Sequence, residues 1–372
     1  MSAGSHAQAS KIRVGVVRGG TSSEYPVSLK TGGSVIKHLP ASKYRVHDIL
    51  ITRDGKWHFD GVEKKPEQIL KHVDVIFNAL HGEFGEDGKI QTLLDTYKAA
   101  YTGSGALASA MAMNKVLTKK HLAHHATQHA GSKIKTAVHL VLRKEEIQNI
   151  SKRAAEIFKT FPHPAVVKPA SAGSSIGVSI VSTLKQLEKA IHSAFEHGDT
   201  VLIEEYIAGK EATCGVIDHF RGEKHYVLPP VEIRKGGASA FFDYEAKYGG
   251  ASEEICPGNF TAAESAEIQR MAREVHRSLG LKHYSRSDFI VHPRRGVYFL
   301  EVNTLPGLTE HSLFPRAMQA VGSGLTELVE HLVGLARGKY WTSGCMRSQC
   351  NRNIDYQKDR RMYDWLNNNF FQ

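Results

Sequence analysis

The chain has 372 residues and a mass of 41.1 kDa, enough for two or three domains. Hydrophobic residues make up 41% and charged residues 23%, the proportions of a globular protein, which excludes a largely disordered chain. The formal net charge is +10. Residues 337–372 contain seven Lys/Arg and three Asp/Glu, so this tail supplies +4 of the total. The charge alone therefore does not indicate nucleic-acid binding.

No segment of the chain carries the pattern of a membrane span or a secretory signal. No apolar run approaches the roughly 18–20 residues that a membrane helix needs, and residues 1–10 lack the basic and apolar regions of a signal peptide. Cys214, Cys256, Cys345 and Cys350 form no Cys-x-x-Cys pair, which argues against a disulfide framework or a structural zinc site. We expect a soluble cytoplasmic protein without nucleic-acid or membrane partners.

The N-terminal part reads as an open α/β sheet. Residues 11–17 form a β-branched run that predicts a strand, followed by a glycine turn at 18–22 and a helix over 26–38. Residues 73–80 predict a second buried strand that ends at His81. Because ligands bind at the carboxyl ends of such strands, His81 is a candidate site residue.

From about residue 111 the pattern becomes that of a second, mixed region. It predicts two helices, at 114–125 and 184–197, and three strands, at 165–168, 178–181 and 201–205. Residues 207–336 then hold several strands and end in two helices, at 262–279 and 324–335. The basic tail from residue 337 has no clear amphipathic period, and we expect no catalytic role for it.

A small-residue loop follows the strand that ends at Lys168. Residues 172–177 are rich in glycine and serine, so backbone N–H groups there can approach phosphate oxygens, and Lys168 supplies a positive charge. The segment fits neither the Walker loop nor the dinucleotide fingerprint. A flexible hairpin loop is the alternative interpretation.

Two further segments carry polar groups in positions that favour ligand contacts. Glu204 and Glu205 end an apolar strand, and Glu211 follows; carboxylates at a domain hinge can accept the adenine amino group or bind ribose hydroxyls. Residues 236–254 place charged and aromatic side chains between small-residue clusters, the composition of a mobile lid. A solvated strand end and an exposed loop are the respective alternatives.

The sharpest pattern is a predicted hairpin over residues 284–303. If it closes symmetrically around 293–296, His292 faces Val297, Asp288 faces Glu301 and Arg286 faces Asn303. The side chains of Asp288, Glu301, Arg286 and Asn303 then share one face of the hairpin. Two opposed carboxylates repel unless a divalent cation lies between them, and Mg²⁺ prefers such oxygen ligands. A solvated sheet face with incidental charge pairing is the alternative. The other face would carry Phe289, Val291, Phe299 and Val302.

These segments together resemble the ATP-grasp fold and, within it, the D-alanine–D-alanine ligases. The similarity runs from about residue 11 to 336 and is carried by short motifs in order. They are Gly19-Gly20-Thr21-Ser22-Ser23-Glu24, Ala79-Leu80-His81-Gly82, Gly85-Glu86-Asp87-Gly88, Tyr101-Thr102-Gly103-Ser104-Gly105, Met113-Asn114-Lys115, Tyr244-Glu245-Ala246-Lys247-Tyr248 and Glu301-Val302-Asn303-Thr304-Leu305-Pro306-Gly307.

The resemblance implies an α/β and α+β fold, with an open parallel α/β domain at 1–105 preceding the two ATP-grasp subdomains at 106–206 and 207–336. It implies ATP-dependent joining of two D-alanines through an acyl phosphate, giving ADP and phosphate, in peptidoglycan precursor synthesis. It also implies a homodimer and two Mg²⁺ (or Mn²⁺) ions.

The resemblance also assigns roles to individual residues. The ATP contacts implied are Lys115, Lys168, Ser175, Glu204, Tyr206, Ile207 and Glu211. The metal ligands are Asp288, Glu301 and Asn303. The catalytic positions are Glu24, Ser174 and Tyr248 at the first D-alanine, Arg286 at the oxyanion and Lys247 in the lid. The remaining substrate positions are His81, Gly307, Ser312 and Leu313.

Three alternatives stay open at this point. One is another ATP-grasp ligase, including a D-alanine–D-lactate (depsipeptide) ligase. Another is a nucleotide-binding scaffold that has lost catalysis, against which the intact metal set argues. A Rossmann dehydrogenase is indicated only by Gly19-Gly20 and lacks the later glycines and the ribose acid.

Tyr248 leads to a testable prediction. In the related depsipeptide ligases this lid position is typically histidine, so the resemblance implies that tyrosine favours dipeptide formation. We expect Tyr248→His to shift product toward D-alanyl-D-lactate at lower pH, measured as the ester-to-amide ratio when both second substrates compete. An unchanged ratio would rule out this role.

Overall fold

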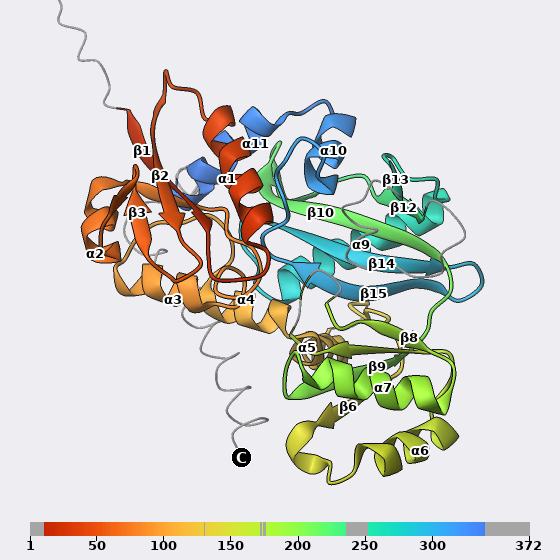
Figure 1. Cartoon of the computed structure of the whole chain (residues 1–372). Coiled ribbons are helices and arrows are strands. Elements are labelled where there is room, and N and C mark those ends of the chain that lie inside the picture. Colours follow the sequence, from red (N-terminus) through yellow and green to blue (C-terminus); the bar gives the residue numbers. More distant parts are fainter. Residues whose placement is uncertain (1–10, 130, 172, 174–175, 236–251, 339–372) are drawn as a thin grey trace, which may run out of the picture.

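The computed structural model describes residues 11–129, 131–171, 173, 176–235 and 252–338, and it is built around three sheets (Figure 1). The sheets occupy residues 12–78, 139–205 and 210–303. The domain boundaries expected from the sequence stay a prediction. Among the described residues, none of the helices has the length and apolar character that crossing a bilayer would require.

The N-terminal sheet has the strand order β4-β3-β2-β1-β5. Its central strand β1 pairs in parallel with β2 and β5, which confirms the open parallel arrangement, while β3 and β4 extend one edge in antiparallel fashion. Val14, Val16 and Val17 of β1 are all fully buried, because helices cover both faces of the sheet. The elements are β1 (Ile12–Gly19), α1 (Tyr25–His38), β2 (Tyr44–Ile51), β3 (Trp57–Phe59), β4 (Val62–Glu63), α2 (Pro66–Ile69), η1 (Leu70–His72), β5 (Val75–Asn78) and α3 (Lys89–Thr96).

The central sheet is antiparallel, with the order β6-β9-β7-β8. Val201 and Ile203 of β9 belong to the core formed with α6 and α7, whereas Leu202 packs with Val116 of α5. Period-two alternation therefore turns Leu202 and Glu204 toward α5. The elements are α4 (Ala106–Met113), α5 (Lys115–Gln128), β6 (His139–Arg143), η2 (Lys144–Glu146), α6 (Ile150–Thr160), β7 (Ala165–Pro169), β8 (Ser179–Val181), α7 (Leu184–Phe195) and β9 (Thr200–Glu205).

The C-terminal sheet has the order β13-β12-β10-β14-β15, with β11 paired to β10. Helix α9 packs on one face of it, and α11 joins its core to that of the N-terminal sheet, as the neighbouring red and blue elements in Figure 1 show. The elements are β10 (Lys210–Phe220), β11 (Glu223–Val227), β12 (Val231–Lys235), β13 (Ser252–Ile255), α9 (Ala262–Ser278), β14 (Tyr284–His292), β15 (Gly296–Asn303), α10 (Leu313–Ala320) and α11 (Leu325–Ala336).

The β14–β15 hairpin has the predicted pairing at one end and a different one at the other. Asp288 faces Glu301 and Arg286 faces Asn303, as expected. The symmetric closure was wrong, since His292 faces Gly296 rather than Val297. From the turn to Phe289, each residue of β14 therefore pairs one position away from the predicted partner. A bulge in β15 shifts the register by one residue between Asp288 and Phe289, so Asp288 and the residues before it have their predicted partners. The four apolar residues predicted for the other face are all buried in the core under α9.

Candidate active site

Two opposed carboxylates form the centre of the site, and each has a cationic partner. The Arg286 guanidinium donates Nε–H to Asp288 Oδ1 at 2.9 Å and Nη2–H to Oδ2 at 3.1 Å. Thr213, on the neighbouring strand β10, donates its hydroxyl to Asp288 Oδ1 at 2.7 Å. Glu301 Oε2 lies 3.0 Å from Lys115 Nζ. The repulsion expected between facing acids is thus offset by one arginine and one lysine from different elements.

The Arg286 side chain is held permanently charged. Burial by itself would lower the pKa of its guanidinium, but the adjacent Asp288 carboxylate raises it above the ordinary value, with Glu301 and Glu86 adding to the effect. Glu86 lies in the N-terminal part of the chain, so carboxylates from both the N-terminal and the C-terminal parts stabilise the charged form of Arg286. A rigid, fully charged guanidinium suits the stabilisation of negative charge that develops during a reaction.

Glu204 lies between two buried lysines. Its Oε1 is 2.6 Å from Lys119 Nζ, and its Oε2 is 2.6 Å from Lys168 Nζ. All three side chains are less than 10% exposed. Burial alone would raise the pKa of Glu204, but the two ammonium groups hold it at about 2. The carboxylate is therefore anionic at neutral pH, and each oxygen keeps a lone pair for a further hydrogen bond.

The fold assembles this group from three elements. Lys115 begins helix α5, whose N-terminus is capped by Asn114 Oδ1 accepting from the N–H groups of Val116 and Leu117. Lys119 follows one turn later, so the two lysines share a helix face. The backbone N–H of Lys115 also donates to the carbonyl of Ala170, which fixes α5 beside the end of β7. The lysines of α5 thereby reach Glu301 on one side and Glu204 on the other.

The Glu24 carboxylate, from the N-terminal part of the chain, lies beside Gly173 of the small-residue loop. A methyl group added at Gly82 would come within 2.6 Å of Glu24 Oε2, and one added at Gly173 within 3.3 Å of the same atom. The carboxylate thus lies between the turn after β5 and the loop that includes the predicted Ser174. Gly82 has a φ of +70°, so a side chain there would be strained as well as crowded.

His81 is buried and fixed by three neighbours. Its Nε2 lies 2.8 Å from Thr31 Oγ1, its backbone carbonyl accepts from the Ser22 hydroxyl, and its Nδ1 lies 3.7 Å from Glu86 Oε1. Glu86 in turn accepts from the N–H of Gly82 at 3.1 Å. Burial is the main cause that raises the pKa of Glu86. This side of the site therefore combines an imidazole with a buried carboxyl group.

The segment after β15 holds the remaining predicted substrate positions. Asn303 Oδ1 accepts from the N–H of Leu305 at 2.7 Å. A methyl group at Gly307 would lie 3.0 Å from Ser312 Oγ, so these two positions are adjacent. Ser312 also hydrogen-bonds Thr309 and precedes α10, which starts at Leu313.

The other predicted ATP contacts lie around the end of β9. Ile207 is buried against Ala137 and Tyr298, and Tyr206 is 37% exposed. Glu211 lies in β10 opposite Ile233 and Ile290. Four predicted site residues, Ser174, Ser175, Lys247 and Tyr248, lie outside the described residues. The structure therefore leaves their roles as predictions.

The chemistry of the donor set fits a hard divalent cation. Asp288, Glu301 and Asn303 offer carboxylate and amide oxygens on one face of the hairpin, and Mg²⁺ takes such ligands together with substrate phosphates. The nearby Arg286 and Lys115 would then share the carboxylates with the ion. This fit rests on the residue types and their register alone.

Three residues of the site were not predicted individually. They are Lys119, Thr213 and Glu86. The four-residue spacing from Lys115 to Lys119 on an expected helix was a signal available in the sequence. Glu86 belongs to the motif at residues 85–88 that contributed to the family resemblance. Thr213 carried no signal, because its contact with Asp288 depends on β10 pairing with β14.

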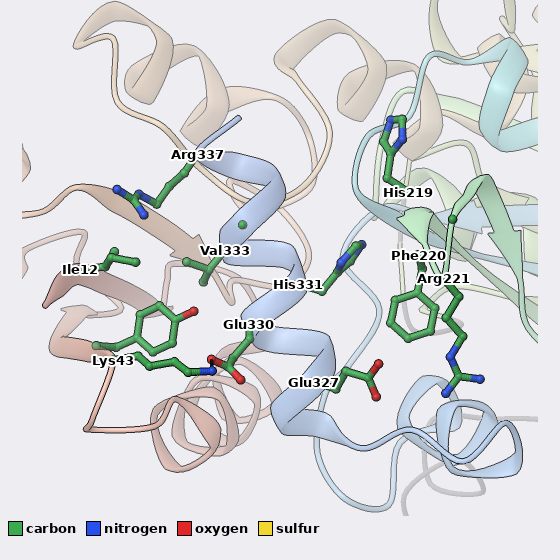
Figure 2. A pocket seen from close by; sticks show the side chains of 13 residues that line it. Ile12, Lys43, His219, Phe220, Arg221, Glu327, Glu330, His331, Val333 and Arg337 are labelled. Atoms are coloured by element: carbon green, nitrogen blue, oxygen red, sulfur yellow. Dashed lines mark hydrogen bonds and ion pairs between the residues drawn. The ribbon is translucent and has the colours of Figure 1, made fainter. Parts of the chain in front are cut away.

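A groove of about 510 Å³ lies between the N-terminal sheet and α11, where Lys43 pairs with Glu330 at 2.8 Å (Figure 2). None of the predicted site residues lines it. The functional assignment therefore rests on the side-chain arrangement and not on the volume of a cavity.

Two family models and many known proteins match this chain. The family described as D-ala D-ala ligase C-terminus matches residues 127–334, and the one described as D-ala D-ala ligase N-terminus matches residues 13–69 and 60–104. A D-alanine–D-alanine ligase of Syntrophobacter fumaroxidans is 39% identical over 88% of this chain and 98% of its own length. One of Syntrophotalea carbinolica is 41% identical over 86% and 95%.

Two solved structures show the same fold. The VanG D-Ala:D-Ser ligase of Enterococcus faecalis superimposes with a TM-score of 0.74 at 29% identity, covering 88% of this chain and 100% of its own. The D-alanine-D-alanine ligase of Coxiella burnetii has a TM-score of 0.74 at 23% identity, covering 96% and 99%.

Proposed function

This chain belongs to the D-alanine–D-alanine ligase family, and we propose that the site around Asp288, Glu301 and Glu204 carries out that family's reaction. The protein is an ATP-dependent ligase of the ATP-grasp fold that joins two D-alanines for peptidoglycan synthesis. The facing Asp288–Glu301 pair, with its cationic partners, is the observation that best supports this location of the chemistry.

The reaction has two steps. The carboxylate of one D-alanine attacks the γ-phosphorus of ATP, so a P–O bond to ADP breaks and an acyl phosphate forms. The amino group of the second D-alanine then attacks the acyl carbon. Phosphate leaves with the electron pair of the C–O bond, and the amine loses a proton. Both steps spread negative charge over oxygen atoms, which positioned cations stabilise.

We assign the nucleotide to the lysine–glutamate group. Lys115 and Lys168 would contact the phosphates. Glu204, anionic and held from two sides, would accept from the adenine amino group, with the backbone around Tyr206 and Ile207 at the ring and Glu211 at the ribose. The low pKa of Glu204 supports this role, because only the deprotonated carboxylate offers acceptors on both oxygens.

We assign the reacting groups to the hairpin and the N-terminal edge. Asp288, Glu301 and Asn303 would hold two Mg²⁺ ions, which neutralise phosphoryl oxygens when bound. Arg286 and the N–H of Gly307 would stabilise the oxyanion of the second step. Glu24 and His81 would position the first D-alanine together with Ser174 and Tyr248, and Ser312 and Leu313 the second. Lys247 would act from a lid that excludes water from the acyl phosphate.

The assembly and location expected of such an enzyme are also proposals. We infer a homodimer in the cytoplasm, where ATP is available. Sedimentation of the purified protein at several concentrations would test the dimer.

The product assay is the direct test. We expect ATP, D-alanine and Mg²⁺ to give D-alanyl-D-alanine, ADP and phosphate, identified by mass. The likeness to a D-Ala:D-Ser ligase makes D-serine one competitor to test, and the depsipeptide alternative makes D-lactate another. A product dominated by either would assign a different second substrate. Formation of AMP would contradict acyl-phosphate chemistry.

A further inference from the structure

A second cluster of ionisable side chains lies at the other end of β10. It comprises Asp218 of β10, His225 of β11 and His276 of α9, and one potential ligand atom from each lies within 4.8 Å of the other two. Asp218 is five residues along the strand from Thr213, or roughly 17 Å at about 3.3–3.4 Å per residue. The cluster is therefore separate from the site built around Asp288, and the reaction proposed above does not use it.

Two of the three distances within the cluster are close to those between ligands of one small metal ion. Asp218 Oδ1 lies 2.8 Å from His225 Nδ1 and 3.0 Å from His276 Nε2. Metal bonds of about 2.0–2.1 Å at angles of roughly 90–109° place neighbouring ligand atoms about 2.9–3.3 Å apart. The ion would replace the two hydrogen bonds to Asp218, with a small rotation of the partly exposed His225 ring.

The surroundings orient these ligands in the way metal sites do. The other ring nitrogen of His276, Nδ1, lies 2.8 Å from Ser285 Oγ. The other carboxylate oxygen of Asp218, Oδ2, accepts from the backbone N–H of His283 at 2.7 Å. Such outer contacts fix the tautomer of a ligating histidine and the rotation of a ligating carboxylate. Both contacts remain intact when the inner atoms bind an ion.

The cluster is buried but reachable. The side chain of His276 is 0% exposed, that of Asp218 11% and that of His225 17%, so the His225 side gives access to solvent and to a fourth ligand, water. The nearby His331 of α11 faces the end of β10 at Phe220 (Figure 2), and its Nε2 hydrogen-bonds the backbone carbonyl of Asp218 at 2.7 Å. It thus adds a contact that holds Asp218 in place.

We propose that Asp218, His225 and His276 form a zinc-binding site that joins the β10–β11 hairpin to helix α9. Two imidazoles and one carboxylate, with water in the fourth position, are a ligand set of open zinc sites. Binding breaks the two histidine–Asp218 hydrogen bonds. The proton on His225 Nδ1 moves to Nε2, and that on His276 Nε2 moves to Nδ1, where it bonds Ser285 Oγ, so the neutral rings lose no net proton. The ligands of this site are two histidines and an aspartate, so the missing Cys-x-x-Cys pairs, which argue against a cysteine-ligated structural zinc site, do not exclude it.

The test uses the full-length enzyme, stripped by a chelator and kept in excess Mg²⁺ so that the active site does not take the added metal. We expect the protein to retain about one Zn²⁺ per chain after gel filtration near neutral pH, and Co²⁺ to give visible absorption bands of a low-coordinate site. Zinc should also raise the melting temperature. Removing one ligand in His225→Gln should weaken binding by roughly 100-fold or more and abolish the bands.

A matched control separates this site from surface histidines. His129, whose Nδ1 lies 2.8 Å from His125 Nδ1 on helix α5, is exposed and belongs to a different histidine group. The His129→Gln variant should bind zinc like the parent. His225→Gln should keep its ligase activity in the absence of zinc, which shows that it is folded. The proposal is overturned if the parent retains no zinc, if His225→Gln binds as tightly as the parent, or if binding is lost in His129→Gln instead.

Discussion

Replacing Arg286 with lysine is expected to lower kcat by roughly 10²–10³-fold, the usual cost of losing one oxyanion-stabilising donor. The guanidinium forms two parallel hydrogen bonds to Asp288 and is buried beside the facing carboxylates. Lysine keeps the positive charge but offers a single ammonium on a flexible stem, so it cannot hold Asp288 and an oxyanion in the same geometry. Steady-state rates of phosphate release with saturating ATP and D-alanine would measure the effect.

The same hairpin supplies a matched control. Arg295 also pairs with a carboxylate, through two 2.9 Å contacts between Nη2 and Glu205, but its side chain is 42% exposed. Arg295→Lys should leave kcat within about two-fold of the parent, because neither Arg295 nor Glu205 is among the predicted catalytic or metal-ligand residues. Equal losses in the two variants, or no loss in Arg286→Lys, would remove Arg286 from the reaction.

Replacing Glu204 with glutamine is expected to cost about 3–5 kcal/mol of unfolding free energy and to raise the KM for ATP strongly. The change removes the carboxylate that pairs with both Lys119 and Lys168 in the described structure. The two buried ammonium groups then lack this anionic partner, which is costly. Burial already lowers the pKa of Lys119, so one lysine can lose its proton and limit the cost. Urea unfolding and ATP titration would measure the two effects.

The neighbouring glutamate is the control for this prediction. Glu205 follows Glu204 on the same strand but pairs with the exposed Arg295. Glu205→Gln should therefore change stability by about 1 kcal/mol or less and leave the KM for ATP nearly unchanged. If the two variants behave alike, the lysine–glutamate group has no special part in binding the nucleotide.

The pH dependence of stability gives an independent check on Glu204. Its pKa is about 2 in the folded chain against an ordinary 4.5. A carboxyl group with a lowered pKa stabilises the fold fully above the unfolded pKa, and this contribution is lost as the pH falls from about 4.5 to 2. The contribution is about 3 kcal/mol at neutral pH. The stability difference between the parent and Glu204→Gln should shrink as the pH falls through that window.

The sequence predicted the elements of the site better than its contacts. The helix of α5 and the alternation of β14 are local properties, and each was expected from neighbouring residues, whereas the capping of α5 by Asn114 was not predicted. The facing of Asp288 and Glu301 followed from alternation and an assumed turn. The turn was wrong by one residue, and a bulge in β15 compensated for it. Bulges have no reliable local signal, because they depend on how both strands pack against the sheet.

By itself, the sequence determined the family, the reaction and the hairpin that brings Asp288 opposite Glu301, because those depend on short motifs and local alternation that need no coordinates. Only the tertiary structure decided that Glu204 lies between Lys119 and Lys168, that Lys115 pairs with Glu301, and that Glu24 lies beside Gly173. These contacts join residues far apart in the chain. The charge state of a buried carboxylate depends on what surrounds it, and no local pattern specifies that.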